Sequence, residues 1–270
     1  SGRSSLGRFL AEGDTFLRMR PRTIILRKSR CEEGLADIMA AAEAASEAGR
    51  PSGARPLVWG GGLPPDDGSP EARPSFAVLP NSLFDQISTQ EKSQGVLCIF
   101  GLPEKDKAQI DGTNVVVLDG VEDPNNLGGI LRTMEAFGSK TLMVTKGTVD
   151  VFNPKVVRCS MGAVVRQRIQ ILEVNSASEL RELLRGFRLY ATTLEGRRLS
   201  TEMGDELTGR DAFVFGNEAR GVSEEILDVV DVQLRIPMAQ GVDSLNVGVA
   251  VGVILHAALA VGAAQSKSGR

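Results

Sequence analysis

The second half of the chain consists of short apolar runs separated by segments with helical spacing of apolar residues. Short runs that are continuously apolar are typical of strands buried on both faces. Runs of this kind, and one of alternating character, predict strands at 115–119, 141–144, 189–193, 212–215 and 232–236. Strands that alternate with helices predict an α/β domain with a mostly parallel sheet.

Helices are expected between these strands. Residues 178–185 predict one helix, and Ser223 predicts the N-cap of another, with two glutamates in its first turn. A third helix ends at Gly138 and carries five apolar residues on one face: Leu127, Ile130, Leu131, Met134 and Phe137.

The longest apolar stretch begins near Asn246. Leu245–Ala264 spans twenty residues without a formal charge when His256 is neutral, which is long enough to cross a bilayer. The stretch is rich in glycine and alanine and lacks aromatic anchors at its ends. These features favour a buried core helix over a membrane span.

The first part of the chain predicts a separate, smaller α/β domain. Residues 51–75 are dense in Gly, Pro and Asp and predict a flexible loop within the acidic stretch 31–75, and 103–112 predicts a linker. The expected domains are therefore residues 1–106 and 112–265. Within the first we expect strands at 9–13, 23–26 and 95–100, a helix at 33–49, and a strand followed by a helix within 78–88.

The composition excludes several kinds of site. His256 is the single histidine, and the three cysteines form no CxxC pair, so no metal site is expected. Free thiols indicate a reducing, intracellular compartment. The chain begins at Ser1 and carries a low-complexity stretch, which favours a processed organellar protein, such as a mitochondrial one, over a bacterial cytoplasmic one.

The net charge of −3 conceals two basic segments. Residues 1–30 hold eight Arg or Lys against two acids, and residues 151–172 hold basic side chains and no acid. Restricted basic segments on a mildly acidic protein are typical of proteins that contact phosphates locally. Ordinary solvated surface explains the same charges equally well.

Three blocks of polar residues follow predicted strands. Asp123–Thr133 opens a helix, with Asn126 near its start and Arg132 about a turn and a half along. Gly216–Ser223 and Ile236–Asn246 follow two later strands. Each block alone also fits a structural role, as a helix cap or a tight turn. GxGxxG and Walker motifs are absent, so a nucleotide-binding site of those types is not expected.

Together the blocks closely resemble the SpoU (TrmH-type) branch of the SPOUT RNA methyltransferases. The matching patterns are N-x-G-x-x-x-R at Asn126–Arg132, G-x-E-x-x-G at Gly216–Gly221 and I-P-M…S-L-N at Ile236–Asn246, with N-P-x-V-x-R-x-S-x-G at Asn153–Gly162. Phe9–Gly13 is similar to the F-L-x-E-G of the N-terminal substrate-binding domain found in rRNA-type members. That domain resembles small ribosomal proteins that bind RNA.

The resemblance implies a fold and a reaction. It implies a C-terminal trefoil knot, S-adenosylmethionine as cofactor, and a homodimer formed through the C-terminal domain with its active site shared between subunits. The reaction would be methyl transfer to a ribose 2′-hydroxyl in rRNA of the large subunit, with no metal and no membrane involved. An arginine is a poor base at its normal pKa, so Arg132 is expected to activate the hydroxyl electrostatically.

The resemblance also assigns site residues. The catalytic set is Arg132, Asn126, Glu218, Ser244 and Asn246. The cofactor-binding set is Thr192, Gly216, Asn217, Gly221, Ile236, Met238, Ser244 and Leu245. The basic residues expected to bind RNA are Arg18, Arg20, Arg22, Arg27, Lys28, Lys155, Arg158, Arg166 and Arg168.

Three other interpretations remain open. One is a tRNA 2′-O-methyltransferase, although tRNA members commonly lack the N-terminal domain. Another is a ribosome-assembly factor with a methyltransferase fold that docks on rRNA without methylating it. The third is a membrane-anchored protein.

Overall fold

The computed structural model describes residues 8–19, 21–32, 75–102, 110, 114–166, 169–199, 207, 209–242 and 244–268. The chain divides into two compact units, residues 1–103 and 104–270. The helix expected at 33–49, the loop at 51–75 except for Ser75, and most of the linker lie outside the described residues.

The first unit is built on a mixed four-stranded sheet with the order β1-β4-β2-β3. Strand β4 runs antiparallel to β1 and β2, and β2 runs parallel to β3. The strands are β1 (Arg8–Glu12), β2 (Thr23–Arg27), β3 (Ser75–Leu79) and β4 (Val96–Gly101), joined by the 3-10 helix η1 (Asp14–Met19) and helix α3 (Asn81–Ile87). The rings of Phe9 and Phe100 stack with centroids 5.5 Å apart, and the ring of Phe16 packs edge-on against Phe100 with centroids 6.4 Å apart.

The second unit is built on a six-stranded sheet with the order β10-β8-β9-β5-β6-β7. Every pairing in this sheet is parallel, which confirms the α/β class. The strands are β5 (Asn114–Asp119), β6 (Thr141–Thr145), β7 (Gln170–Val174), β8 (Arg188–Arg198), β9 (Asp211–Gly216) and β10 (Val232–Arg235).

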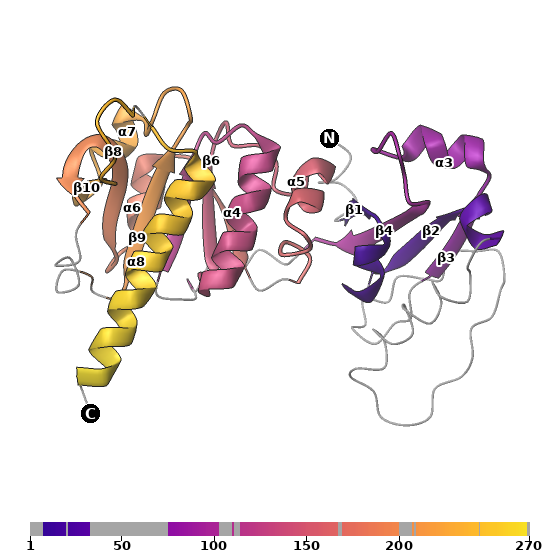
Figure 1. The fold of residues 1–270 in the computed structure, drawn as a ribbon, viewed down its shortest axis with the longest axis horizontal. Coiled ribbons are helices and arrows are strands. Elements are labelled where there is room, and N and C mark those ends of the chain that lie inside the picture. Colours follow the sequence, from indigo (N-terminus) through magenta and orange to yellow (C-terminus); the bar gives the residue numbers. More distant parts are fainter. Residues whose placement is uncertain are drawn as a thin grey trace. The chain divides into compact units, whose positions relative to one another are not determined.

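Helices cover both faces of this sheet. Val115 and Val117 of β5 share a core with Leu180 and Leu184, which lie on and directly after α6. Helix α8 contacts β5 and β9 and packs along α4, so these two helices form a neighbouring pair (Figure 1). The helices are α4 (Pro124–Phe137), α5 (Pro154–Cys159), α6 (Ala177–Leu183), α7 (Glu224–Leu227) and α8 (Val247–Ser268).

Several expected elements form with different details. Gly138 ends α4 with φ of 72°, as its position predicted. Ser223 is the N-cap residue of α7, as predicted, although its side chain makes no capping hydrogen bond. Strand β8 continues past 193 to Arg198, because residues 197 and 198 pair with β10. Among the described helices, none is long and apolar enough to cross a membrane.

Candidate active site

Helix α4 places the first polar block at the carboxyl end of β5. Asp123 is its N-cap and accepts a 2.9 Å hydrogen bond from the Asn125 N–H, and Pro124 follows at the first helical position. The cap is therefore Asp123, and the Asn126 side chain is left for other contacts.

Asn126 joins the three polar blocks. Its side-chain amide donates to Glu218 Oε1 at 2.6 Å, and its Oδ1 accepts from the Asn246 amide at 2.8 Å. The order Asn246–Asn126–Glu218 fixes which way each amide faces, because each amide donates to the next residue. Residues from three distant parts of the sequence therefore form one hydrogen-bonded chain.

Asn246 also caps the long helix. Its Oδ1 accepts from the backbone N–H groups of Gly248 at 2.9 Å and Val249 at 3.3 Å. The side chain thus satisfies orphan donors at the start of α8 while its amide reaches Asn126. Ser244 and Leu245, expected in the same site, are exposed just before this cap.

The turn after β9 holds Glu218 in place. Asn217 and Gly221 exchange backbone hydrogen bonds of 3.0 and 2.9 Å, and Gly221 has a φ of 72°. A Cβ on Gly216 would lie 2.0 Å from the Gly221 carbonyl carbon, so only glycine fits there. Close packing within the turn requires glycine at 216 and the positive φ favours it at 221, in agreement with the tight-turn role that this block also fits.

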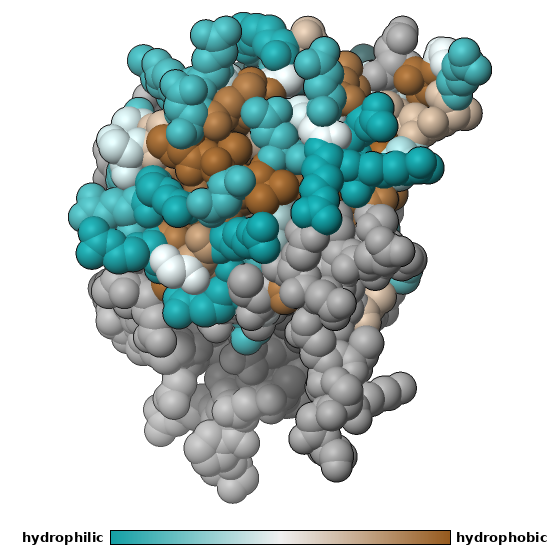
Figure 2. Space-filling model, turned by 90° about the vertical axis from the view of Figure 1, so that its left-hand side faces the viewer, coloured by the Kyte–Doolittle hydropathy of each residue, from teal (hydrophilic) through white to brown (hydrophobic). Residues whose placement is uncertain are grey.

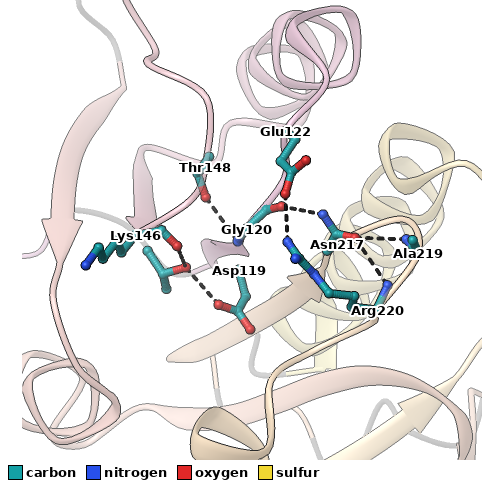
Figure 3. A network of polar contacts seen from close by, with 9 residues as sticks. Asp119, Gly120, Glu122, Lys146, Thr148, Asn217, Ala219 and Arg220 are labelled. Carbon is teal, nitrogen blue, oxygen red and sulfur yellow. Dashed lines mark hydrogen bonds and ion pairs between the residues drawn. The ribbon is translucent and has the colours of Figure 1, made fainter.

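The side chain of Asn217 stabilises the same turn. Its Oδ1 accepts from the N–H groups of Ala219 and Arg220, and its amide donates to the Gly120 carbonyl at 2.7 Å (Figure 3). The side chain ties the turn after β9 to the loop after β5. It therefore contributes to the site by fixing two loops rather than by pointing a free amide outward.

The sequence interpretation missed further polar residues of this network. Arg220 pairs with Glu122 at 2.7 Å, and Thr148 Oγ1 lies 3.2 Å from the N–H of Gly120 (Figure 3). Asp119 accepts from the Thr145 hydroxyl at 2.7 Å and from the Ser223 N–H at 2.7 Å. An acid at the last position of a buried strand was the available signal for Asp119.

Arg132 does not join the hydrogen-bonded chain. It is exposed on α4, six residues after Asn126, which corresponds to about 9 Å along a helix axis and a rotation of about 240°. Helical spacing instead puts it on the face of Asn125 and Gly129. A groove of about 450 Å³ between α4 and α8 is lined by Asn126, Gly129, Phe137 and Val249, and Arg132 is not among the described residues that line it.

The segments expected to bind a cofactor follow neighbouring strands. Strands β10, β8 and β9 are adjacent and parallel, so their carboxyl ends share one edge of the sheet. Thr192 lies where β8 bulges away from β10, and its hydroxyl donates to the Val214 carbonyl at 3.1 Å. Ile236 and Met238 are half-buried and lie in the irregular segment that follows β10, where the backbone is not paired with a neighbouring strand. Half-buried apolar side chains can pack against the face of an adenine ring, and backbone groups not used in strand pairing can hydrogen-bond to its polar edge.

The basic residues fall into distinct environments. Arg27 pairs with Asp85 at 2.8 Å, and Arg166 makes a two-pronged ion pair with Glu135, which raises the pKa of the Arg166 guanidinium. Lys155 and Arg158 are exposed on α5, and Arg22 and Lys28 lie in the first unit. Arg20, Arg168 and the side chain of Arg18 lie outside the described residues.

Comparisons with known proteins agree with this arrangement. A model of the "SpoU rRNA Methylase family" matches residues 113–256. The "23S rRNA (guanosine(2553)-2'-O)-methyltransferase RlmP" of Bacillus subtilis is 29% identical over 180 residues, covering 66% of this chain and 70% of that protein. The "23S rRNA (guanosine-2'-O-)-methyltransferase RlmB" of Xylella fastidiosa is 39% identical over 145 residues, covering 54% of this chain and only 57% of that protein.

Solved structures match over nearly the whole chain. A putative RNA methyltransferase of the TrmH family from Porphyromonas gingivalis is 28% identical with a TM-score of 0.70, covering 94% of this chain and 90% of that one. An AdoMet-bound rRNA methyltransferase from Sinorhizobium meliloti is 25% identical with a TM-score of 0.69, covering 95% and 88%. Since the family model covers more than half of the chain, including most of the second unit and all three polar blocks, the chain belongs to the SpoU rRNA methylase family.

Proposed function

We propose that this protein transfers a methyl group from S-adenosylmethionine to the 2′-hydroxyl of a ribose in ribosomal RNA of the large subunit. The observation that carries the proposal is the hydrogen-bonded chain Asn246–Asn126–Glu218, which unites the three polar blocks at one place. The two curated relatives described above bear the names of 23S rRNA 2′-O-methyltransferases.

The cofactor supplies an already activated methyl group on a sulfonium centre. A ribose hydroxyl is a poor nucleophile at neutral pH, so the protein has to hold it in line and stabilise its developing negative charge. Arg132 is the proposed source of that stabilisation, because its guanidinium stays charged and can face the oxygen. Asn126 and Glu218 act as positioning residues, and Thr192, Gly216, Ile236 and Met238 would line the cofactor site.

A second copy of the chain would complete the site. Within one chain Arg132 lies about 9 Å along the axis of α4 from Asn126, and it is not among the described residues that line the groove between α4 and α8. Val249 and Leu259 on α8 are 52% and 48% exposed, which leaves apolar surface for a partner. We infer a homodimer through the second unit, in which the α4–α8 surface is buried and Arg132 meets the hydrogen-bonded chain of the other copy. A knotted path for the C-terminal segment is part of the same proposal.

The first unit is proposed to bind rRNA, as its resemblance to RNA-binding ribosomal proteins implies. Arg22 and Lys28 there, and Lys155 and Arg158 on α5, are the proposed phosphate contacts in the described residues. The two curated relatives described above come from bacteria, which favours a bacterial origin over the organellar one expected from the sequence.

Methyl transfer from labelled S-adenosylmethionine to separate rRNA and tRNA pools tests the proposal. We expect label in large-subunit rRNA with the wild type and its loss with Arg132→Ala. The matched control is Arg185→Ala, an exposed arginine after α6. Label in tRNA alone would assign the tRNA reaction. No label in either pool, from a dimer that binds rRNA, would favour a non-catalytic assembly factor.

A further inference from the structure

Two arginines face each other across neighbouring strands of the second sheet. Arg198 of β8 and Arg235 of β10 are register partners. Partners in a parallel ladder project from the same face, and their strands lie about 4.8 Å apart. Like charges placed directly opposite each other destabilise a sheet, so this pair has an energetic cost in the free protein.

Nothing in the described part of the chain neutralises the pair. Both side chains are exposed, and neither guanidinium forms an ion pair with a carboxylate of the described residues, including the nearby Glu195. Strand β10 is the edge of the sheet, so one side of the pair is open. Figure 2 views the molecule from the side on which β8 and β10 lie in Figure 1, and hydrophilic residues surround a hydrophobic area there.

The backbone beneath the pair is rigidly placed. Gln233 pairs with Ala191 and the next residue of β10 pairs with Arg197, so residues 192–196 bulge out of the ladder. A Cβ on Gly196 would lie 2.6 Å from the Gln233 carbonyl carbon, so the bulge returns in close contact with β10. This contact accompanies the register that brings Arg198 opposite Arg235, so the two side chains start from facing positions on one face of the ladder.

We propose that Arg198 and Arg235 form a clamp for one backbone phosphate of the RNA substrate. A phosphodiester carries one negative charge and two free oxygens, so each arginine can take one oxygen through paired N–H donors. Binding of the phosphate would offset the repulsion between Arg198 and Arg235 with an attractive contact from each arginine to the phosphate. The assignment of RNA as the ligand rests on the proposed function.

The clamp lies beside the segments proposed for the cofactor. Arg235 immediately precedes Ile236, and the bulge that ends before Arg197 contains Thr192. A phosphate held there would anchor the strand of RNA next to the reacting nucleotide. Phosphate contacts of this kind fix the register of a nucleic acid without reading its sequence.

Protection of an exposed sheet edge is a simpler role for a charged residue on β10. Edge protection requires only one charged side chain on β10, of either sign. It does not explain why a second positive charge, Arg198 of β8, lies opposite Arg235. The two roles differ in their consequence, because edge protection predicts no change in RNA affinity when the charges are removed.

The test compares wild type with the double variant Arg198→Gln/Arg235→Gln in RNA titrations at several salt concentrations. We expect about tenfold weaker binding to large-subunit rRNA fragments, and a salt dependence whose slope is smaller by about 0.7 to 1. Affinity for S-adenosylmethionine should stay unchanged. Arg185→Gln changes an exposed arginine in the turn between α6 and β8, so it is the matched control and should bind RNA like wild type.

Thermal unfolding supplies a second measurement without RNA. Inorganic phosphate should raise the Tm of the wild type more than that of the double variant, and the variant itself should be at least as stable as wild type. Equal RNA affinity in the wild type and double variant, an equal loss in Arg185→Gln, or a fall in cofactor affinity would each overturn the clamp. A wild type that binds rRNA through these arginines yet transfers no methyl group would refute the proposed function and leave the clamp standing.

Discussion

Asn126 and Glu218 lie 92 positions apart in the chain, and the amide of Asn126 donates a 2.6 Å hydrogen bond to the Glu218 carboxylate. The bond connects the first turn of α4 with the turn after β9. A charged acceptor makes such a bond stronger than one between neutral groups. Through Asn246 the same amide is tied to the start of α8, so one side chain orients three elements of the site.

Replacing Glu218 by glutamine should lower the rate of methyl transfer about 100-fold. The hydrogen bond from Asn126 would lose its charged acceptor, and the residues of the site would no longer be held in alignment. Glu218 is exposed, so the thermal stability of the protein should change little. Initial rates of methyl transfer, together with a thermal melt, check this. Glu225→Gln, on the exposed first turn of α7, is the control and should keep full activity. Equal rates for the two variants would contradict a positioning role for Glu218.

Two adjacent glycines of α4 should respond oppositely to alanine. A Cβ on Gly128 would lie 2.4 Å from the Cβ of Cys159, whereas a Cβ on Gly129 would meet nothing within 4 Å. Gly128→Ala should therefore destabilise the second unit by about 1–3 kcal/mol through overpacking against α5. Gly129→Ala should stabilise it by up to about 1 kcal/mol through helix propensity. Calorimetric unfolding of both variants checks this, and equal shifts would disprove the close contact between α4 and α5.

The thiol of Cys98 should be inert in the folded protein. Burial, followed by the nearby Asp14 carboxylate, raises the pKa of this thiol to about 12 from an ordinary value of 9.0. Thiol reagents should therefore label Cys98 only after unfolding, whereas the half-buried Cys31 and Cys159 should react in the folded protein. Peptide mapping after timed labelling measures the order.

The same raised pKa predicts a pH dependence of stability. The unfolded state loses the Cys98 proton near pH 9.0 and the folded state near pH 12, so the contribution is complete below pH 9.0 and disappears as the pH rises toward 12. The free energy of unfolding should fall more steeply above pH 9 in wild type than in Cys98→Ala. Parallel pH profiles for the two proteins would contradict the burial of this thiol.

Asp231 should contribute stability that is lost in acid. Partial burial opposes its ionisation, but the Leu189 N–H and the two-pronged pair with Arg181 at 3.0 Å outweigh burial and lower its pKa. The contribution is present above the ordinary value of 3.8 and is lost as the pH falls below it. Asp231→Asn should cost about 1 kcal/mol at pH 7, because the pair is partly exposed, and almost nothing at pH 2. Denaturant titrations at both pH values check this, and an equal cost at the two would exclude an ionic origin.

Much of the second unit was predictable because its local signals agree with its tertiary structure. The apolar runs of β5, β6 and β9 are buried on both faces, and the helical spacing of α4 ends at a glycine with positive φ. Asn246 was a candidate cap from its position alone, and it does cap α8.

Other elements depend on contacts that no local pattern contains. Helix α5 has six residues, which is too short for a periodic signal, and β7 owes its place to pairing with β6. The last residues of β8 are polar and become strand only because β10 lies beside them. The hydrogen bonds of Asn217 with Gly120 and of Asn126 with Asn246 join residues far apart in sequence. The sequence could therefore identify the asparagines as site residues, but it could not show which residues they contact.

The strand order also sets the sequence of events during synthesis. Asn114 of β5 pairs with Asp211 of β9, so the central strand leaves the ribosome long before its partner exists. Until β9 emerges, β5, β6 and β7 form half a sheet whose inner edge is open, a state prone to wrong pairing. The Asn126–Glu218 bond can form once the turn after β9 has emerged, but the complete hydrogen-bonded chain also needs Asn246, which lies directly before the last helix. An interrupted or truncated nascent chain would therefore carry a formed half-sheet but no assembled catalytic centre.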